Sequence, residues 1–290
     1  MIDAKTMDKI KKMQRGEITE FYVYHAIAKR LKDQKNREIL EKIGREERAH
    51  ALVWSKYTNE EPKPYQFRIF WYSFLNLIFG YTFTLKLMEK AEIDASDVYE
   101  SIATNVNEAK RIAVEEDEHE AQLIAMLDEE RLQYVGSMVL GLNDALVELT
   151  GTLAGLSLAL QNTKLIALSG LVTGISATLS MMSSEYLSAK SDREEHPFKS
   201  ASYTGIMYLV AVAAMVLPYL IFDSGHYLYA LFTMLSIVVL IILIFTYYVS
   251  VAQDIPFKSR FLEMITISLS VAAFSFIVGL LVKQVLGIDI

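Results

Sequence analysis

Two short motifs in the first half of the chain place a glutamate three residues before a histidine. Glu47 precedes His50, and Glu116 precedes His119. Residues i and i+3 lie on one face of an α-helix, so each motif presents a carboxylate and an imidazole side by side. Carboxylate oxygens and imidazole nitrogens are ligands of divalent transition metals. The two motifs therefore predict metal binding.

Other glutamates occur in pairs before and between these motifs. Two helices that each carry a Glu, combined with two that carry Glu-x-x-His, form the di-metal site of di-iron carboxylate proteins. In such sites the carboxylates bridge two divalent cations about 3.5–4 Å apart, and the imidazoles occupy the outer positions. We therefore predict a di-iron site, in which Mn or Zn could replace iron, with these metal ligands: Glu17, Glu20, Glu47, His50, Glu89, Glu92, Glu116 and His119.

Two alternatives accompany this interpretation. A single Glu-x-x-His motif in a Glu-rich helix is also typical of a solvated charged face, and only its repetition favours metal binding. Glu20 is either a ligand or a neighbour that supports Glu17. The remaining acidic residues beside the motifs are interpreted as solvated: Glu46, Glu115, Asp117 and Glu118.

The elements that must position these residues are helices. The apolar periodicity predicts helices over residues 6–31, 35–57, 66–91 and 96–132, with Pro62 and Pro64 breaking the chain after the second. Four helices with short connections favour a bundle.

Charge divides the chain into two predicted domains, residues 1–134 and 135–290. The first contains 21 of the 28 Lys and Arg residues and 25 of the 35 Asp and Glu residues. The second has the composition of a polytopic membrane protein. No basic patch indicates nucleic acid as a partner. The chain has no Cys, so disulfides, thiolate metal sites and thiol redox chemistry are excluded.

One apolar stretch in the first domain, residues 67–85, is long enough to cross a membrane. A span there would put the helices bearing His50 and His119 on opposite sides of the bilayer, and the four-helix site could not form. We therefore predict a buried helix or a dimer face instead.

Five apolar segments in the second domain are predicted to cross a membrane, because each is about 20–26 residues long. The loops after the second and fourth segments carry basic residues. Positive charge marks the cytoplasmic side, so residues 1–134 are predicted to be cytoplasmic and the C-terminus extracytoplasmic. The apparent lack of a signal peptide agrees with this orientation. The predicted spans are 135–160, 165–187, 203–222, 227–251 and 262–286.

Acidic residues inside two of these spans are the second candidate site. Asp144 and Glu148 in the first span, and Met181 and Glu185 in the second, are each four residues apart. Ionisable groups within a membrane are costly and mark ion or proton paths. Carboxylate and thioether ligands suit Fe(II) and also accept Mn(II), Co(II) or Zn(II). Asp144 is the strongest candidate, because it lies deep in its span; Glu185 could instead be an interfacial anchor.

The first domain resembles ferritins and rubrerythrins. Residues 17–24 (EITEFYVY) are similar to their first helix, and residues 112–120 (IAVEEDEHE) are similar to the last ligand helix of rubrerythrins. The resemblance places Glu17, Glu116 and His119 at ligand positions. It implies that the bundle binds or oxidises Fe(II).

The second domain resembles the vacuolar iron transporter family. The similar segments are GLND (141–144), SMMSSEYLS (180–188), YTGIMY (203–208) and PFKSRFLEM (256–264). The resemblance implies that Asp144, Met181 and Glu185 line a metal path, and that a homodimer exports Fe(II) in exchange for protons. The loop 188–202 is shorter than the metal-binding insertion of plant and fungal-type members, which the ferritin-like domain could replace. Together the domains resemble the membrane-bound ferritin branch.

These observations predict an all-α protein, with a cytosolic ferritin-like four-helix bundle followed by a five-helix transmembrane domain. The predicted function is export of Fe(II) or Mn(II) across the cell membrane, coupled to protons, by a multi-pass homodimer embedded in lipid. The rival hypothesis is a membrane-anchored di-iron ferroxidase or peroxidase that carries no ions.

Overall fold

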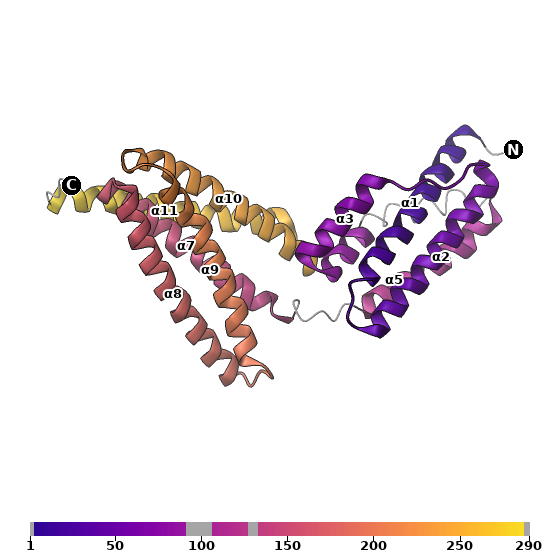
Figure 1. The fold of residues 1–290 in the computed structure, drawn as a ribbon, viewed down its shortest axis with the longest axis horizontal. Coiled ribbons are helices and arrows are strands. Elements are labelled where there is room, and N and C mark those ends of the chain that lie inside the picture. The colour runs from indigo at the N-terminus through magenta and orange to yellow at the C-terminus, as the bar shows by residue number, and fades with distance from the viewer. Residues whose placement is uncertain (1–2, 91–105, 127–132, 287–290) are drawn as a thin grey trace. The chain divides into compact units, whose positions relative to one another are not determined.

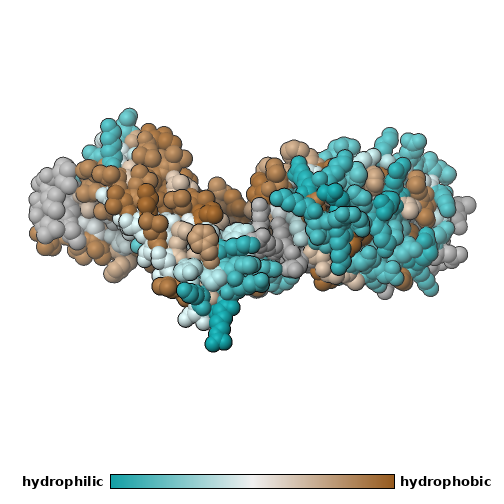
Figure 2. All heavy atoms as spheres, turned by 60° about the horizontal axis from the view of Figure 1, so that its bottom comes forward, coloured by the Kyte–Doolittle hydropathy of each residue, from teal (hydrophilic) through white to brown (hydrophobic). Residues whose placement is uncertain are grey.

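The computed structural model describes residues 3–90, 106–126 and 133–286. These residues form helices and no strand, which confirms the predicted all-α class. The chain divides into two compact units, Met1–Glu129 and Glu130–Ile290, each of which is described by itself. Figure 2 shows a largely hydrophilic face on the first unit and extensive hydrophobic surface on the second.

The first unit is built on two long antiparallel helices, α1 and α2, which pack closely together (Figure 1). Asp3 caps α1 by accepting a hydrogen bond from the Thr6 amide, and Asp33 caps α2 in the same way through the Asn36 amide. Such caps satisfy amide groups that have no partner inside the helix. The labelled helices of this unit are α1 (Ala4–Ala28), α2 (Gln34–Thr58), α3 (Gln66–Phe79) and α5 (Asn107–Ala125).

The predicted helix over residues 66–91 is interrupted. α3 ends at Phe79, Gly80 adopts a φ of 90° that favours glycine, and residues 81–90 form a separate helix. Residues 82–85 are buried as predicted, but α3 is not a buried helix in the single chain, because only Leu75 is buried; the alternative, a dimer face, stays a prediction. Val106 is not helical, so α5 starts at Asn107 rather than near residue 96; residues 91–105 and 127–132 lie outside the described part.

The interior of the first unit has two apolar clusters. One contains Ile10, Met13 and Trp54, and the other contains Val23, Ile43 and Leu123. Along α1, α2 and α5, the predicted metal ligands lie between the residues of these two clusters. A polar layer is therefore enclosed by apolar packing on both sides.

The second unit contains five helices that are long and apolar enough to cross a membrane, as predicted. α7 packs against each of the other four, and α8 packs closely on α9 (Figure 1). A short 3₁₀-helix, η1 (Ser224–His226), precedes the fourth. The five are α7 (Val135–Leu160), α8 (Thr163–Ser191), α9 (Pro197–Ile221), α10 (Tyr227–Ala252) and α11 (Phe257–Leu286).

Small residues allow these helices to approach one another. Gly170 of α8 faces Leu153 of α7, as predicted for these two helices, whereas two other glycines face α9. A Cβ atom at Gly141 of α7 would lie 2.2 Å from the Thr204 carbonyl oxygen of α9. Gly174 of α8 likewise faces Val212 of α9. The small residues of α7 and α8 were predicted to pack these two helices together or against a partner copy. At these two positions they instead bring α9 close.

We predict that Gly141→Ala destabilises the membrane unit, because the new methyl group would meet backbone atoms that cannot rotate away. Overpacking of this kind costs roughly 1–3 kcal/mol. The measurement is the apparent Tm of the purified chain in detergent. Gly136→Ala is the matched control on the same helix, because a Cβ there meets nothing within 4 Å. Equal Tm values for the two variants would contradict the close α7–α9 approach.

Candidate metal centre and transport path

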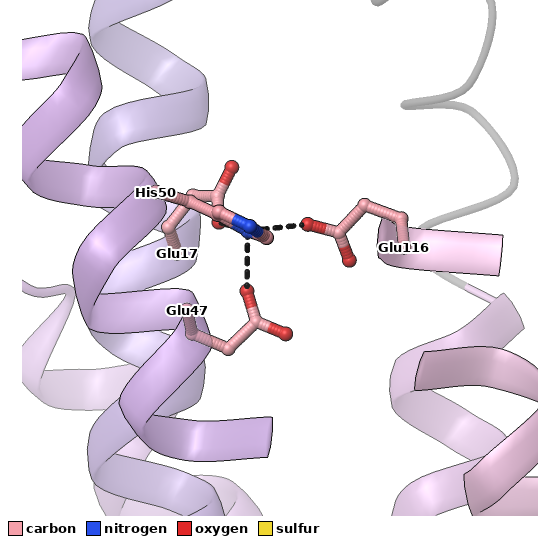
Figure 3. Close-up of side chains that lie close together, drawn as sticks. All are labelled: Glu17, Glu47, His50 and Glu116. Carbon is pink, nitrogen blue, oxygen red and sulfur yellow. Dashed lines mark hydrogen bonds and ion pairs between the residues drawn. The ribbon is translucent and has the colours of Figure 1, made fainter. Parts of the chain in front are cut away.

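Three helices of the first unit bring four predicted ligands together. α1 contributes Glu17, α2 contributes Glu47 and His50, and α5 contributes Glu116 (Figure 3). One ligand atom from each residue lies within 4.8 Å of the others. Glu17, Glu47 and His50 are buried, and Glu116 is partly buried. These four residues form a cluster that could bind a metal ion.

His119 joins this cluster from α5, and the two histidines are arranged in parallel. Their ring centroids lie 5.7 Å apart, and the rings stack. Glu116 Oε1 lies 3.0 Å from His50 Nδ1, while Glu47 Oε1 lies 3.1 Å from His119 Nδ1. The second oxygen of each carboxylate faces the histidine of its own motif. Glu47 Oε2 lies 3.8 Å from His50 Nδ1, and Glu116 Oε2 lies 3.6 Å from His119 Nδ1. Glu47 and Glu116 therefore lie between the two imidazoles, as bridging ligands would.

The outer nitrogens of the two histidines bind glutamates that sequence reasoning left as solvated. His50 Nε2 lies 2.8 Å from Glu115 Oε2, and His119 Nε2 lies 2.9 Å from Glu46 Oε2. The prediction for Glu46 and Glu115 was therefore wrong. The signal was present in the sequence, because both motifs read Glu-Glu-x-x-His, at residues 46–50 and 115–119. An Nε2–H bond to a carboxylate fixes the ring and leaves Nδ1 to face the cluster.

The pKa values of the cluster are shifted because several carboxylates lie close together and away from water. Burial alone would lower the pKa of His119, but hydrogen bonds with Glu116 and Glu47 raise that pKa to about 10. The pKa of His50 is raised by the same kind of contact, with Glu116, Glu17 and Glu47. Burial and neighbouring carboxylates raise the pKa of Glu47 well above its usual value. Without a metal, protons on the imidazoles offset the carboxylate charge.

The residues present fit a divalent cation. Three carboxylates, Glu17, Glu47 and Glu116, lie within 4 Å of the single Nδ1 of His50, which carries at most one proton. Glu47 Oε2 is buried and accepts no hydrogen bond from the described residues. Trp54 Nε1 donates to Glu17 Oε1 at 3.0 Å and so orients that side chain. A cation would satisfy the converging oxygens better than one proton can.

The other predicted ligands of this unit are not part of the four-residue cluster. Glu20 is partly buried and lines a small cavity of about 50 Å³ with Arg68 and Tyr72. The pKa of Glu20 is raised first by burial and then by the charges of Glu47, Glu17 and Glu116. Glu20 therefore lies close enough to the cluster to interact with it electrostatically. Glu89 is partly buried in the helix of residues 81–90. Glu92 lies outside the described residues.

The predicted acidic residues of the membrane unit lie at two depths along α7, one contributed by α8 and the other by α7 itself. Near its start, Ser137 Oγ donates a 2.7 Å hydrogen bond to Glu185 Oε1 of α8. Seven residues later, about 10 Å along the axis, Asp144 is partly buried. Glu148 is exposed on the same helix, and its Oε2 accepts a 2.9 Å bond from Tyr208 OH of α9.

The four predicted path residues do not form one ligand cluster within a single chain. Met181 is partly buried and packs against the apolar core of the unit, whereas Asp144 and Glu148 lie near Tyr208. Among the described residues, the only group of three or more potential His or carboxylate ligands is the one in the first unit. Met182 of α8 packs against Gly205 of α9.

A cavity of about 480 Å³ lies where α7 and α9 begin and α8 ends. Its acidic and imidazole lining consists of Glu185, Glu194, Glu195 and His196, beside Ser137 and Ser200. Sequence reasoning identified only Glu185 here. The consecutive Glu194, Glu195 and His196 were read as part of a short loop, and a run of three polar residues is too common in loops to indicate a site.

An all-helical unit with five candidate spans and acidic residues within them is typical of ion transporters. Residues 135–196 match the VIT family, so this part of the membrane unit is similar to that family, and the match suggests transport of metal ions across a membrane. The match covers α7, α8 and the loop that ends at His196. No curated protein and no solved structure matches the chain.

We predict that Glu115→Gln weakens metal binding by the bundle about 10–100-fold, as loss of a carboxylate partner of a ligating histidine does elsewhere. An amide still accepts a hydrogen bond but no longer draws the proton toward Nε2. The measurement is competition for Mn(II) against a chelator of known affinity. Glu118→Gln is the matched control, an exposed residue three positions along the same helix. Equal affinities in the two variants would contradict the role assigned to Glu115.

Proposed function

We propose that this chain exports Fe(II) or Mn(II) from the cytosol across the cell membrane in exchange for protons. The observation that carries the proposal is the position of Glu185 of α8 and Asp144 of α7 at two depths along α7, within residues that match the VIT family. The orientation is supported by basic residues where α8 ends and α9 begins, Lys190, Arg193 and Lys199, and by Lys258 and Arg260 near the start of α11. They support a cytoplasmic position for the acidic cavity.

The cavity is the proposed entrance for the ion. Its carboxylates attract a dication from the cytosol and lower the cost of removing its hydration shell. Ser137 holds one oxygen of Glu185, which leaves the other oxygen to face an incoming ion. Asp144 lies one level deeper in the same helix and forms no ion pair with a basic residue in the described part of the chain. A bound dication would stabilise the charge of Asp144 in the membrane, and a bound proton would neutralise that charge.

A homodimer is supported by Glu148. This residue lies near the middle of α7, and its side chain is exposed on the single chain. A carboxylate at that depth would face acyl chains unless another protein surface covers it. A second copy packed on this side would shield Glu148 and would add its own acidic residues to the path.

The bundle is proposed to collect the ion before transport. Glu17, Glu47 and Glu116 would hold the metal through carboxylate oxygens, and His50 and His119 would hold it through Nδ1. Bound metal supplies Lewis acidity and, if it is iron, a redox couple. The chain's own residues orient the carboxylates, exclude water through the two apolar clusters, and retain protons on the imidazoles when metal is absent.

A second candidate function rests on the same buried cluster. A membrane-anchored ferroxidase or peroxidase would oxidise Fe(II) in the bundle with oxygen or peroxide as the electron acceptor. The membrane helices would then be an anchor. Asp144 argues against this function, because an anchor does not require an intramembrane carboxylate.

We predict that Asp144→Ala abolishes Mn(II) and Fe(II) flux into proteoliposomes while the purified chain still binds metal in the bundle. Flux is read with a metal-sensitive dye in the lumen, with a pH gradient imposed or omitted. Asp223→Ala, at the opposite end of the membrane unit, is the control and should transport normally. Unchanged flux in Asp144→Ala would remove the proposed path. Consumption of oxygen or peroxide with Fe(II), but no flux in the unmodified chain, would favour the enzyme.

A further inference from the structure

α3 carries large apolar side chains on one exposed face. We call this the α3 face; it consists of Phe67, Phe70, Trp71, Phe74, Leu77 and Ile78. Phe67 is 74% exposed and Leu77 is 65% exposed, and Leu75 is the only fully buried residue of the helix. The spacing of three and four residues places all six on one side. The opposite side of α3 rests on α1.

The rings of the α3 face form a continuous surface. Phe67 stacks on Trp71 with centroids 6.4 Å apart, and Phe70 stacks on Phe74 at 6.3 Å. Trp71 also lies 6.0 Å from the Phe74 ring. Scattered apolar residues are normal on a protein surface, but a contiguous aromatic patch marks a site that another apolar phase or partner covers.

α3 is too short to cross a bilayer. Its 14 residues extend about 21 Å, against a hydrocarbon core of roughly 30 Å. Gly80 ends the helix, and the next segment returns to the protein interior, where Phe83, Leu85 and Met88 are buried. The C-terminal end of α3 is therefore fixed to the bundle. A short helix with one apolar face and a fixed end can lie along an interface but cannot span.

Basic residues border the α3 face. Arg68 belongs to α3, and its guanidinium lies 4.9 Å from the centre of the Tyr65 ring. The guanidinium of Arg15 lies 3.9 Å from the same ring, and Arg15 Nε donates to the Lys63 carbonyl oxygen. On the other side, Arg30 donates to the Ser73 carbonyl oxygen at 3.4 Å. α3 itself contains no acidic residue. This charge pattern complements anionic lipid headgroups.

A bilayer is always within reach of this unit. The chain itself contributes five candidate membrane helices, the first of which begins at Val135. Ten residue steps separate Ala125, the end of α5, from Val135, and they extend at most about 36 Å. The first unit therefore faces a lipid surface at a high effective concentration, whatever else is in the solution.

We propose that the α3 face lies in the boundary between headgroups and acyl chains of the bilayer that holds the five spans. Arg15, Lys63, Arg68 and Arg30 contact anionic headgroups beside it. This docking holds the metal cluster close to the membrane surface from which ions depart. It concerns the surface of the first unit alone and does not depend on whether the chain transports metal.

The test uses the full chain in vesicles and the fluorescence of its own Trp71. Trp54, the other tryptophan, is 0% exposed, whereas Trp71 is 43% exposed. The vesicles contain phosphatidylcholine with bromine near the top of the acyl chains, with or without phosphatidylglycerol. The Trp71→Phe variant supplies the Trp54 background for subtraction. We expect the Trp71 signal to fall about twofold or more in the brominated vesicles, as for an interfacial helix.

The charge contribution is tested with Lys63→Gln, which removes one bordering cation. Quenching should weaken in this variant when phosphatidylglycerol is present and should be less sensitive to salt. Lys12→Gln is the matched control, because Lys12 is an exposed α1 lysine that pairs with Asp8. Equal effects of the two variants would overturn the assignment of headgroup contacts to these basic residues.

A second copy of the chain is the competing occupant, and the same preparation distinguishes it. The chain has no Cys, so Phe70→Cys introduces a unique thiol. If disulfides form rapidly between copies and brominated lipid does not quench Trp71, then a second copy of the chain, and not the membrane, covers the α3 face. Quenching of Trp71 by aqueous iodide, but not by lipid, would mean that the face is solvated. Either result overturns the proposal.

Discussion

Carboxylates held away from water require positive charge nearby, and this requirement governs both units of the protein. In the bundle, Glu47 and Glu116 lie between two imidazoles, and protons on those rings offset the acids when no metal is bound. In the membrane unit, Asp144 has no ion pair with a basic residue in the described part of the chain. In the first unit the protein itself supplies the positive charge, whereas in the membrane unit we propose that an incoming cation supplies it.

The surroundings of the two candidate sites differ. The bundle encloses its polar layer between two apolar clusters, and Trp54 and the outer glutamates fix the ligand side chains. Such a site favours retention of metal. The membrane unit brings helices into close contact at Gly141 and Gly174, yet it leaves a cavity beside Glu185 and spreads its acids over two levels. Such an arrangement favours entry and release.

Much of this architecture could be predicted from the sequence, because it follows from local patterns. Long apolar runs require membrane helices, and all five were found. The Glu-x-x-His spacing fixes ligand pairs on one helix face, and the bundle brings Glu47, His50 and Glu116 together with Glu17. The break at Gly80 was not predicted, because glycine also occurs within helices. The sequence also left open whether α3 is buried or forms an exposed dimer face, because the apolar pattern of a helix is the same in both cases.

Contacts between helices were the least predictable. Glu46 and Glu115 each bind a histidine of the other motif, and sequence spacing within one helix cannot indicate a partner on another. The small residues of α7 and α8 indicated close packing but not that Gly141 and Gly174 both face α9. Residues 194–196 line the cavity only because α8 ends there. In each case, tertiary packing decides which of several available faces a residue meets.

The most direct measurement of the central claim is anomalous diffraction from crystals of the full chain grown with Mn(II). The account predicts two peaks about 3.5–4 Å apart, each on the Nδ1 atom of one histidine, with Glu47 and Glu116 bridging them. It would be contradicted by saturating Mn(II) that leaves no peak there while His50 and His119 keep their Nδ1 contacts to the carboxylates.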